Sequence, residues 1–329
     1  MIYIETGSTK PYINLAFEEY FLQNHDLGDD IFMLWQNEPT IVVGRFQNTL
    51  QEVNQAYTEA HHIHLIRRIS GGGAVYHDLG NLCYTFILNG ITPDKVDVPL
   101  FARPVVSALA KFGIHAEATG RNDLTLDGKK FSGTAMALQK KRLLFHGTLM
   151  YDTDLTVLSE ALRVAPDKIE SKGVKSVRSR VTNIKPYAPS DLTIEQFKEA
   201  LKQSFFGEGA QREYHPTPED LAAIQDLSVK KYQSWEWNFG SNPSAGVVYS
   251  KRFTGGKLEI HLDIEKGQII FCQIRGDFLG LCEAEEVEKR LTGIPYREDA
   301  ILRAMEDVDM KKHFGTITRD EFLMTILGK

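Results

Sequence analysis

Short apolar runs and helical periods follow one another along the first 150 residues. Strand-like length and composition are found in six runs, at residues 2–5, 31–35, 40–43, 64–67, 82–88 and 143–150. Helical spacing relates Ile13, Phe17 and Phe21, and a second helix is expected over 103–112. Hairpins are thus mixed with helical crossovers. The pattern predicts an α+β fold with a mixed sheet rather than a doubly wound parallel one.

Turn and helix-cap residues predict where further strands and helices begin and end. Asp127-Gly128 separates two short apolar runs and predicts a two-residue β-hairpin, with strands at 123–126 and 129–132. Farther along the chain, helices are expected over 155–164 and 193–205. The second of these opens with a capping box of Thr193 and Gln196.

The stretch 240–244, with the sequence GSNPS, is the best candidate for a linker. Beyond it, apolar residues alternate with polar ones from Leu258 to Ile264, a Lys266-Gly267 turn follows, and three amphipathic helical segments complete the chain. We therefore expect two domains, at residues 1–243 and 244–329, the second a small α+β unit.

Composition and charge restrict the partners. The chain has 329 residues, 42% of them hydrophobic and 25% charged, and a formal net charge of −6. Non-specific nucleic-acid binding needs a basic excess, so no nucleic-acid partner is expected. The three cysteines lie in apolar surroundings, the first 25 residues lack a signal-peptide pattern, and no apolar run approaches the roughly 18 residues of a membrane span. These features favour a cytoplasmic protein that does not enter a membrane.

The most informative motif is the segment RRISGGGAVYHDLGN at residues 67–81. Consecutive glycines let backbone N–H groups surround an anion, and Arg68 beside them adds a fixed positive charge. The segment is neither a P-loop nor a dinucleotide fingerprint. A flexible turn is the alternative interpretation. The strand-like runs on both sides instead favour a positioned loop that binds a nucleotide or an acyl phosphate.

Several other polar residues are candidates for the same site. Lys130 follows the predicted hairpin and precedes small residues, where its ammonium group can reach a phosphate or a carbonyl, although a solvated surface lysine is the common alternative. His146 and Thr148 share one face of their strand. Asn81 carries amide groups suited to an adenine edge, and Asp123 can serve Mg²⁺, but both residues also suit ordinary turns.

Six blocks of sequence, in the same order, closely resemble the lipoate–protein ligases. They are RRISGGGAVYHDLGN at 67–81, GRNDL at 120–124, KFSGTA at 130–135, HGTL at 146–149, SVRSRVTN at 176–183 and WEWNFG at 235–240. Together they cover most of the first 240 residues. The resemblance implies a catalytic domain of the fold shared with the biotin–protein ligases, followed by a C-terminal accessory domain.

The resemblance also implies a reaction and its site. ATP and lipoate would form lipoyl-adenylate, and the lipoyl group would pass to a lysine of apo lipoyl-domain proteins. The acceptors implied are the acyltransferase subunits of 2-oxoacid dehydrogenases and the glycine cleavage H protein. Lys130 matches the family's lysine and would be catalytic. The residues implied to bind ATP and lipoyl-adenylate are Arg68, Gly73, Ala74, Val75, Tyr76, Asn81, Asn122, Asp123, Lys130, His146 and Thr148, with Asp123 as the implied ligand of Mg²⁺.

Two other classes of function remain open from the sequence. An acyltransferase of the same fold would move octanoyl or lipoyl groups between carrier proteins through a cysteine thioester, and it needs an exposed, activated thiol. A lipoate or nucleotide sensor would bind without catalysis. Neither Cys83, in an apolar strand, nor Cys272 and Cys282, in the second domain, lies in a loop beside Lys130. The ligase is therefore the preferred hypothesis.

Overall fold

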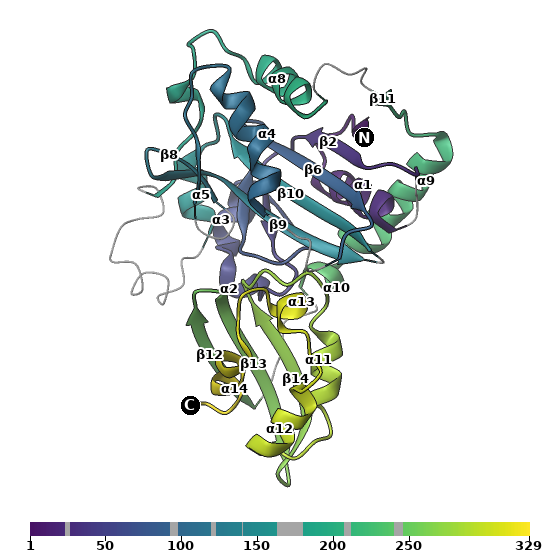
Figure 1. Ribbon diagram of the computed structural model, residues 1–329, viewed down its shortest axis with the longest axis vertical. Helices are drawn as coiled ribbons and strands as arrows, with labels where there is room; N and C mark the ends of the chain where they lie inside the picture. The colour runs from purple at the N-terminus through teal and green to yellow at the C-terminus, as the bar shows by residue number, and fades with distance from the viewer. Residues whose placement is uncertain are drawn as a thin grey trace.

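The computed structural model has a large α+β unit and a smaller C-terminal unit below it (Figure 1). It describes residues 1–23, 27–92, 98–119, 123–139, 141–162, 180–206, 212–239 and 246–329. The predicted domain boundary falls within 240–245, outside the described residues, and stays a prediction. None of the helices in the described segments is long and apolar enough to cross a membrane.

In the described part of the chain, eight strands form the main sheet, in the order β11-β1-β2-β6-β10-β9-β8-β7. Neighbours from β11 to β2 are parallel and the rest antiparallel, so the sheet is mixed as predicted. The strands are β1 (Ile2–Glu5), β2 (Ile31–Trp35), β6 (Asn81–Asn89), β7 (Glu117–Thr119), β8 (Asp123–Leu126), β9 (Lys129–Gln139), β10 (Arg142–Met150) and β11 (Arg212–Glu213).

Helices cover both faces of this sheet, which explains why β2 and β6 are almost entirely apolar and buried. On the face nearer the viewer in Figure 1, α4 (Val98–Ala110) and α8 (Ile194–Phe206) pack on residues such as Phe32 and Phe86. On the other face, α1 (Pro11–Gln23) and α9 (Pro218–Leu227) pack on Met33 and Ile87. A pocket lined in part by Leu15 lies on the α1 face.

A second, three-stranded sheet in the order β4-β3-β5 carries the glycine-rich segment. Its strands are β3 (Thr40–Val43), β4 (His64–Arg67) and β5 (Val75–His77), and the glycines connect β4 to β5. β3 is parallel to β4 and antiparallel to β5. Short helices flank this sheet, namely α2 (Thr49–Glu52), α3 (Gln55–Ala60) and α5 (Leu155–Ala161). The loop therefore lies between two strands. The first was predicted, whereas the second is β5 rather than the predicted strand-like run at 82–88.

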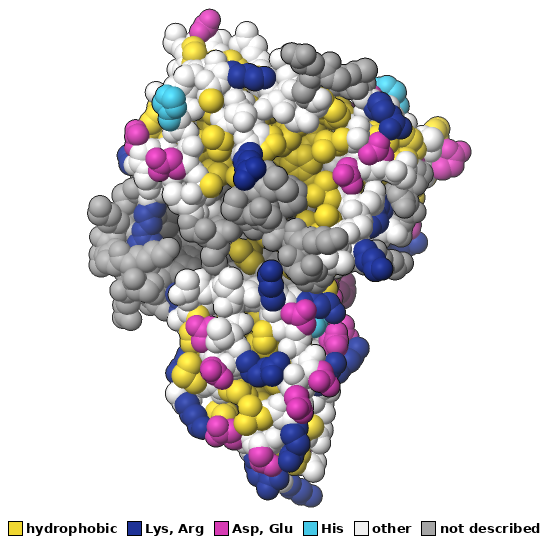
Figure 2. All heavy atoms as spheres, in the orientation of Figure 1, with side chains coloured by type: hydrophobic (Ala, Val, Ile, Leu, Met, Phe, Trp, Pro, Cys, Tyr) yellow, Lys and Arg dark blue, Asp and Glu magenta, His cyan; other side chains and the backbone are white. Residues whose placement is uncertain are grey.

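The C-terminal unit is an antiparallel meander of β12 (Val247–Phe253), β13 (Gly256–Glu265) and β14 (Gln268–Gly276). Four helices pack on it, namely α11 (Glu285–Leu291), α12 (Glu298–Met305), α13 (Met310–Phe314) and α14 (Arg319–Ile326). On the face shown in Figure 2, acidic and basic side chains are interspersed over this unit. The remaining elements, η2 (Lys185–Tyr187), η3 (Ser228–Tyr232) and α10 (Trp235–Asn238), belong to the larger unit.

Candidate active site

A pocket opens between the glycine-rich segment and strands β9 and β10. Its empty space, which includes the open mouth, is about 610 Å³. Apolar and small residues form most of the wall, and cationic and polar groups form the rest. The lining residues are Leu15, Trp35, Val42, Arg68, Gly72, Gly73, Ala74, Val75, His77, Cys83, Lys130, Gly133, Thr134, Ala135, His146, Gly147 and Thr148.

The glycine-rich loop is held by close backbone contacts. Gly72 has φ +86°, a left-handed conformation that favours glycine, and its N–H donates to the Phe278 carbonyl at 3.1 Å. A Cβ at Gly71 would lie 2.6 Å from the same carbonyl oxygen. At Gly73, by contrast, a Cβ would meet no protein atom within 4 Å. The loop is therefore packed at 71–72 and open to the pocket at Gly73.

Arg68 lies beneath this loop with its guanidinium buried. Its Nε donates to Ser70 Oγ at 3.0 Å, and its terminal nitrogens donate to the carbonyls of Val42, Gly71 and Gly73 at 3.2, 2.6 and 2.9 Å. Burial lowers the pKa of Arg68 to about 10, which leaves it a cation at neutral pH. The sequence predicted a phosphate contact for this residue. The structure assigns most of its donors to the loop backbone, with the charge at the pocket wall.

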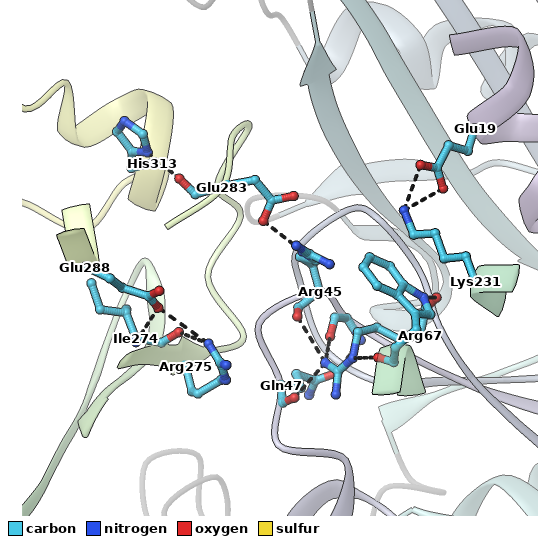
Figure 3. Close-up of polar contacts among 12 residues, drawn as sticks. Glu19, Arg45, Gln47, Arg67, Lys231, Ile274, Arg275, Glu283, Glu288 and His313 are labelled. Atoms are coloured by element: carbon cyan, nitrogen blue, oxygen red, sulfur yellow. Dashed lines mark hydrogen bonds and ion pairs between the residues drawn. The ribbon is translucent and has the colours of Figure 1, made fainter. Parts of the chain in front are cut away.

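Arg67 has a different role from its neighbour. Its guanidinium donates to the carbonyls of Gly44, Arg45 and Gln47 at 2.7–3.0 Å, and Figure 3 shows it beside Arg45 and Gln47. It also contacts Thr49 and residues 237–238. Burial is the main reason that its pKa falls to about 9. Arg67 does not line the pocket. It ties the loop at 44–49 to the end of β4 and so fixes where the glycine-rich loop begins.

The C-terminal unit contacts the same region. The rings of Phe46 and Phe278 stack with centroids 4.8 Å apart, and the Gly276 N–H donates to the Phe46 carbonyl at 2.8 Å. Arg45 forms an ion pair with Glu283 at 2.8 Å, which Figure 3 shows. In this conformation the C-terminal unit therefore supports the back of the glycine-rich loop.

Lys130, the second residue of β9, lines the pocket. Its Nζ forms an ion pair with Asp123 Oδ1 at 2.7 Å, and both side chains are more than a third exposed. A Cβ at Gly133 would lie 3.0 Å from Nζ, so the lysine side chain passes directly over that glycine. The neighbouring Lys129 is exposed, as the alternation of a strand predicts. The Thr182 N–H donates to the Lys130 carbonyl, which places the segment after Arg180 along the start of β9.

The other predicted residues are brought together only in part. Ala74, Val75, His146 and Thr148 line the pocket with Gly73. Tyr76 does not, because β5 turns it into the opposite cluster with Ile41 and Val53. Asn81 is fully buried, and its Nδ2 donates to Cys83 Sγ at 3.2 Å. Asn122 lies outside the described residues, and all these binding roles stay predictions.

Two residues at the closed end of the pocket are uncharged because of burial. Burial, helped by the nearby Arg68 and His146, lowers the pKa of His77 to about 3, and Asn37 Nδ2 contacts its Nδ1 at 3.1 Å. Burial also raises the pKa of the Cys83 thiol well above its ordinary range. Cys83 lines the same pocket as Lys130, a proximity that the sequence did not predict. The thiol is nevertheless buried and protonated, which is unfavourable for a nucleophile.

The sequence analysis did not identify Glu18 and Ser70, which contact the pocket-lining His146. Glu18 on α1 is 1% exposed and lies 2.9 Å from His146 Nδ1, and Ser70 Oγ lies 2.6 Å from His146 Nε2. A glutamate within the apolar face of a helix, between Phe17 and Phe21, is the signal that identifies such a residue.

Comparison with known proteins identifies the family. The model of the lipoyl protein ligase A/B catalytic domain matches residues 10–206, and the model of the bacterial lipoate protein ligase C-terminus matches residues 242–326. The chain belongs to the lipoate–protein ligase family. The resemblance inferred from the six sequence blocks is thereby confirmed.

Individual ligases match over nearly the whole chain. Lipoate-protein ligase LplJ of Bacillus subtilis is 41% identical over 98% of this chain and 99% of its own length. Lipoate–protein ligase 1 of Staphylococcus aureus is 42% identical over 96% of both chains. The match therefore includes the C-terminal unit as well as the catalytic one.

Solved structures of ligases share the fold. P. falciparum LipL1, in complex with lipoate, superposes with a TM-score of 0.78 over 99% of this chain and 98% of its own, at 24% identity. A lipoate-protein ligase A bound with ATP gives a TM-score of 0.62 at 29% identity, covering 73% of this chain and 97% of its own. The bipartite ligase of Thermoplasma acidophilum, analysed with its lipoyl domain, gives 0.64 at 30% identity and covers 75% and 98%. The α+β fold with a mixed sheet is confirmed.

Proposed function

We propose that this ligase activates lipoate with ATP and then transfers the lipoyl group to a lysine of apo lipoyl domains. The observation that carries the proposal is the composition of one pocket. Its apolar wall includes Leu15, Trp35 and Val42, and the same pocket is lined by Arg68, Gly73 and Lys130. An acyl chain needs the first kind of wall, and an adenylate phosphate needs the second.

In the first step, the lipoate carboxylate attacks the α-phosphorus of ATP. A P–O bond forms to the acyl group, and the bond to pyrophosphate breaks. The backbone at Gly73 and Ala74 binds the phosphate, and the buried charge of Arg68 offsets the negative charge that accumulates there. The Lys130 ammonium leaves its ion pair with Asp123 and contacts the phosphate and acyl oxygens instead. There it stabilises the negative charge that develops on them.

In the second step, the acceptor amine attacks the acyl carbonyl. A C–N bond forms, the bond from carbon to the AMP oxygen breaks, and the amine releases a proton. No nucleophile from the protein is needed, because the mixed anhydride is already reactive. The contribution of the protein is orientation and electrostatic stabilisation.

Mg²⁺ would enter with the nucleotide and neutralise pyrophosphate charge. The described residues contain no cluster of three or more acidic, His or Cys side chains for a metal. A nucleotide-borne Mg²⁺ needs only one or two protein carboxylates. Asp123, whose carboxylate reaches the pocket-lining Lys130, fits that requirement. We keep it as the proposed ligand.

The acceptors that we propose are acyltransferase subunits of 2-oxoacid dehydrogenases and the glycine cleavage H protein. Cys83 and Cys272 are buried free thiols, and Cys282 is a partly buried one, which supports a reducing, cytoplasmic location.

The decisive assay combines the purified chain with ATP, Mg²⁺, lipoate and an apo lipoyl domain, and follows the acceptor by mass spectrometry. We expect lipoyl addition that requires both ATP and lipoate, with one pyrophosphate released for each adenylate formed. A sensor would bind lipoate or nucleotide without releasing pyrophosphate, and that result would overturn the proposal.

The position of Cys83 on the pocket wall makes the thioester route the second candidate. Cys83→Ser separates the two, because the ligase needs no thiol and a thioester transferase cannot work without one. We expect the variant to keep ATP-dependent lipoylation within about threefold of the unmodified chain, since the substitution preserves size and removes no proposed contact. Complete loss of transfer with retained folding would favour the thioester route.

A further inference from the structure

Buried hydrogen bonds connect the acyl end of the pocket to the glycine-rich loop. Trp35 Nε1 contacts Thr85 Oγ1 at 2.9 Å, and Thr85 Oγ1 contacts Glu18 Oε1 at 2.5 Å. The Glu18 carboxylate contacts His146 Nδ1 at 2.9 and 3.1 Å, and His146 Nε2 contacts Ser70 Oγ at 2.6 Å. The Ser70 hydroxyl also meets Arg68 Nε at 3.0 Å.

The direction of each hydrogen bond follows from the two ends. The Arg68 guanidinium can only donate, so the Ser70 oxygen accepts that bond, and we assign the Ser70 proton to His146 Nε2. With that assignment His146 Nε2 accepts, and a neutral imidazole then carries its proton on Nδ1, facing Glu18. The indole of Trp35 also only donates, so the Thr85 proton likewise points to Glu18. Both assigned protons therefore point at the Glu18 carboxylate.

Between Glu18 and Arg68, this series of hydrogen bonds connects a carboxylate to a guanidinium. Glu18 is 1% exposed and Arg68 is 5% exposed, so neither charge is well solvated. Arg68 in turn binds the carbonyls of Gly71 and Gly73, the segment proposed to hold the adenylate. A buried charge that lacks its hydrogen-bond partners is strongly destabilised, so the arrangement is held tightly.

We propose that Glu18 is a positioning residue for the adenylate-binding loop, acting through His146, Ser70 and Arg68. Its carboxylate holds His146 in the Nδ1–H tautomer, so that Nε2 accepts from Ser70 and Ser70 accepts from Arg68. The guanidinium is thereby kept under the carbonyls of Gly71 and Gly73. This role rests on the proposed function, because the loop is taken to bind the phosphate of the adenylate.

Glu18→Gln is the informative substitution, because it keeps the shape and removes the charge. One carboxylate oxygen becomes an NH₂ donor, so the side chain no longer favours a proton on His146 Nδ1. The alternative tautomer places an N–H against Ser70, whose hydroxyl proton must then turn away. Arg68 loses a fixed acceptor, and the loop loses its preset geometry.

The chain offers a matched control in the next residue of α1. Glu19 is 4% exposed and is also bound, by Lys231 at 2.7 Å and by Tyr232 at 2.6 Å, but it has no contact with His146. Glu19→Gln removes a buried carboxylate of the same helix without touching the chain of contacts to the loop.

The experiment measures two quantities on both variants. Lipoate-dependent pyrophosphate release gives kcat and the KM for ATP, and nitrogen-15 NMR of the ligand-free protein reports the His146 tautomer. We expect Glu18→Gln to lower kcat/KM for ATP by about 10- to 100-fold, as a misplaced binding group does. Its His146 should lose the pure Nδ1–H signature. Glu19→Gln should change kcat/KM by less than about threefold, as expected of a carboxylate remote from the reacting groups.

Ser70→Ala is the second variant, for the case in which Glu18→Gln does not fold. It interrupts the chain at its centre and should lower the same ATP parameter while His146 stays protonated on Nδ1. Equal kinetics for Glu18→Gln and Glu19→Gln, or an Nε2–H tautomer in the unmodified chain, would overturn the inference. The tautomer measurement does not depend on catalysis. An inactive protein with the predicted His146 tautomer would therefore contradict the proposed function but not the hydrogen bonds from Glu18 to Arg68.

Discussion

The two cationic walls of the pocket differ in burial and in the number of contacts that hold them. Arg68 is 5% exposed and is fixed by four hydrogen bonds to Ser70 and to the backbone. On the opposite wall, the Lys130 side chain is 39% exposed and has a single ion pair, to Asp123. An exposed ion pair is worth about 0–1 kcal/mol and is easily exchanged, whereas a buried guanidinium is not.

This difference separates what is preformed from what responds to the substrate. The backbone of the glycine-rich wall is bound by Arg68 and by Phe278, so we expect it to keep its shape when a ligand binds. Lys130 can leave Asp123 and follow the phosphate or the acyl oxygen. Substitutions on the first wall should therefore affect folding and binding together, and those on the second should affect the rate alone.

The largest effect is expected at the exposed wall. Lys130→Ala should lower the rate of lipoyl-adenylate formation by about 10²–10³-fold, because one charge contact to the transition state is lost. The free energy of unfolding should change by less than about 1 kcal/mol. Single-turnover pyrophosphate release and urea denaturation measure the two. Lys129→Ala is the control and should retain the normal rate; a comparable loss there would remove the distinction between the two lysines.

At the buried wall, Arg68→Met should destabilise the fold by roughly 2–4 kcal/mol and should also weaken nucleotide binding. The substitution leaves the carbonyls of Gly71 and Gly73 without their donor, and each buried unsatisfied group costs about 1–3 kcal/mol. Urea unfolding measures the first quantity, and calorimetric titration with ATP measures the second. A stability loss like that of Lys130→Ala would mean that the two walls do not differ.

The acid dependence of folding should identify the buried neutral histidine. The pKa of His77 is lowered from 6.5 to about 3 in the folded chain, so between these values the unfolded state binds a proton that the folded state does not. Stability is then fully present above pH 6.5 and falls on acidification by up to about 1.4 kcal/mol per pH unit. His77→Gln should show a shallower decline in urea midpoints from pH 6.5 to 4, and parallel curves for the two proteins would refute the assignment.

A smaller effect is expected from Gly133→Ala. The new methyl group would lie 3.0 Å from Lys130 Nζ and 3.1 Å from its Cε, so the lysine must shift by a few tenths of an ångström. We expect about a tenfold lower rate of adenylate formation, with an unchanged affinity for lipoate, because only the position of the ammonium changes. Single-turnover kinetics and calorimetric titration with lipoate separate the two, and a normal rate would mean that Lys130 acts from another rotamer.

Local sequence signals predicted much of the fold. Asp127 and Gly128 both have positive φ, at 50° and 73°, as the predicted hairpin turn requires. The capping box at Thr193 and Gln196 is present, and β13 and β14 flank the predicted Lys266-Gly267 turn. These features depend on a few neighbouring residues, so the sequence is sufficient to predict them.

The arrangement of the strands in the sheets was harder to predict from the sequence. β2 and β3 are consecutive in the sequence yet belong to different sheets, which no local pattern reveals. The second half of β9 was missed because its small residues, Gly133 to Ala135, resemble a loop. The sequence did not predict the short helix α13 either.

The candidate site shows the same division. The glycine-rich segment and Lys130 were found from motifs, whereas Glu18 and Ser70 were missed because their roles depend on a partner more than 70 residues away on β10. Cys83 was placed away from Lys130, but β6 and β9 bring both residues to one pocket.

The most direct test is a crystal structure of the chain with lipoyl-adenylate bound. We predict the acyl chain between Trp35 and Val42, the phosphate against the backbone of Gly73 and Ala74, and Lys130 Nζ turned from Asp123 onto the ligand. An adenylate bound elsewhere, or a Lys130 that remains paired with Asp123 and faces solvent, would contradict the account.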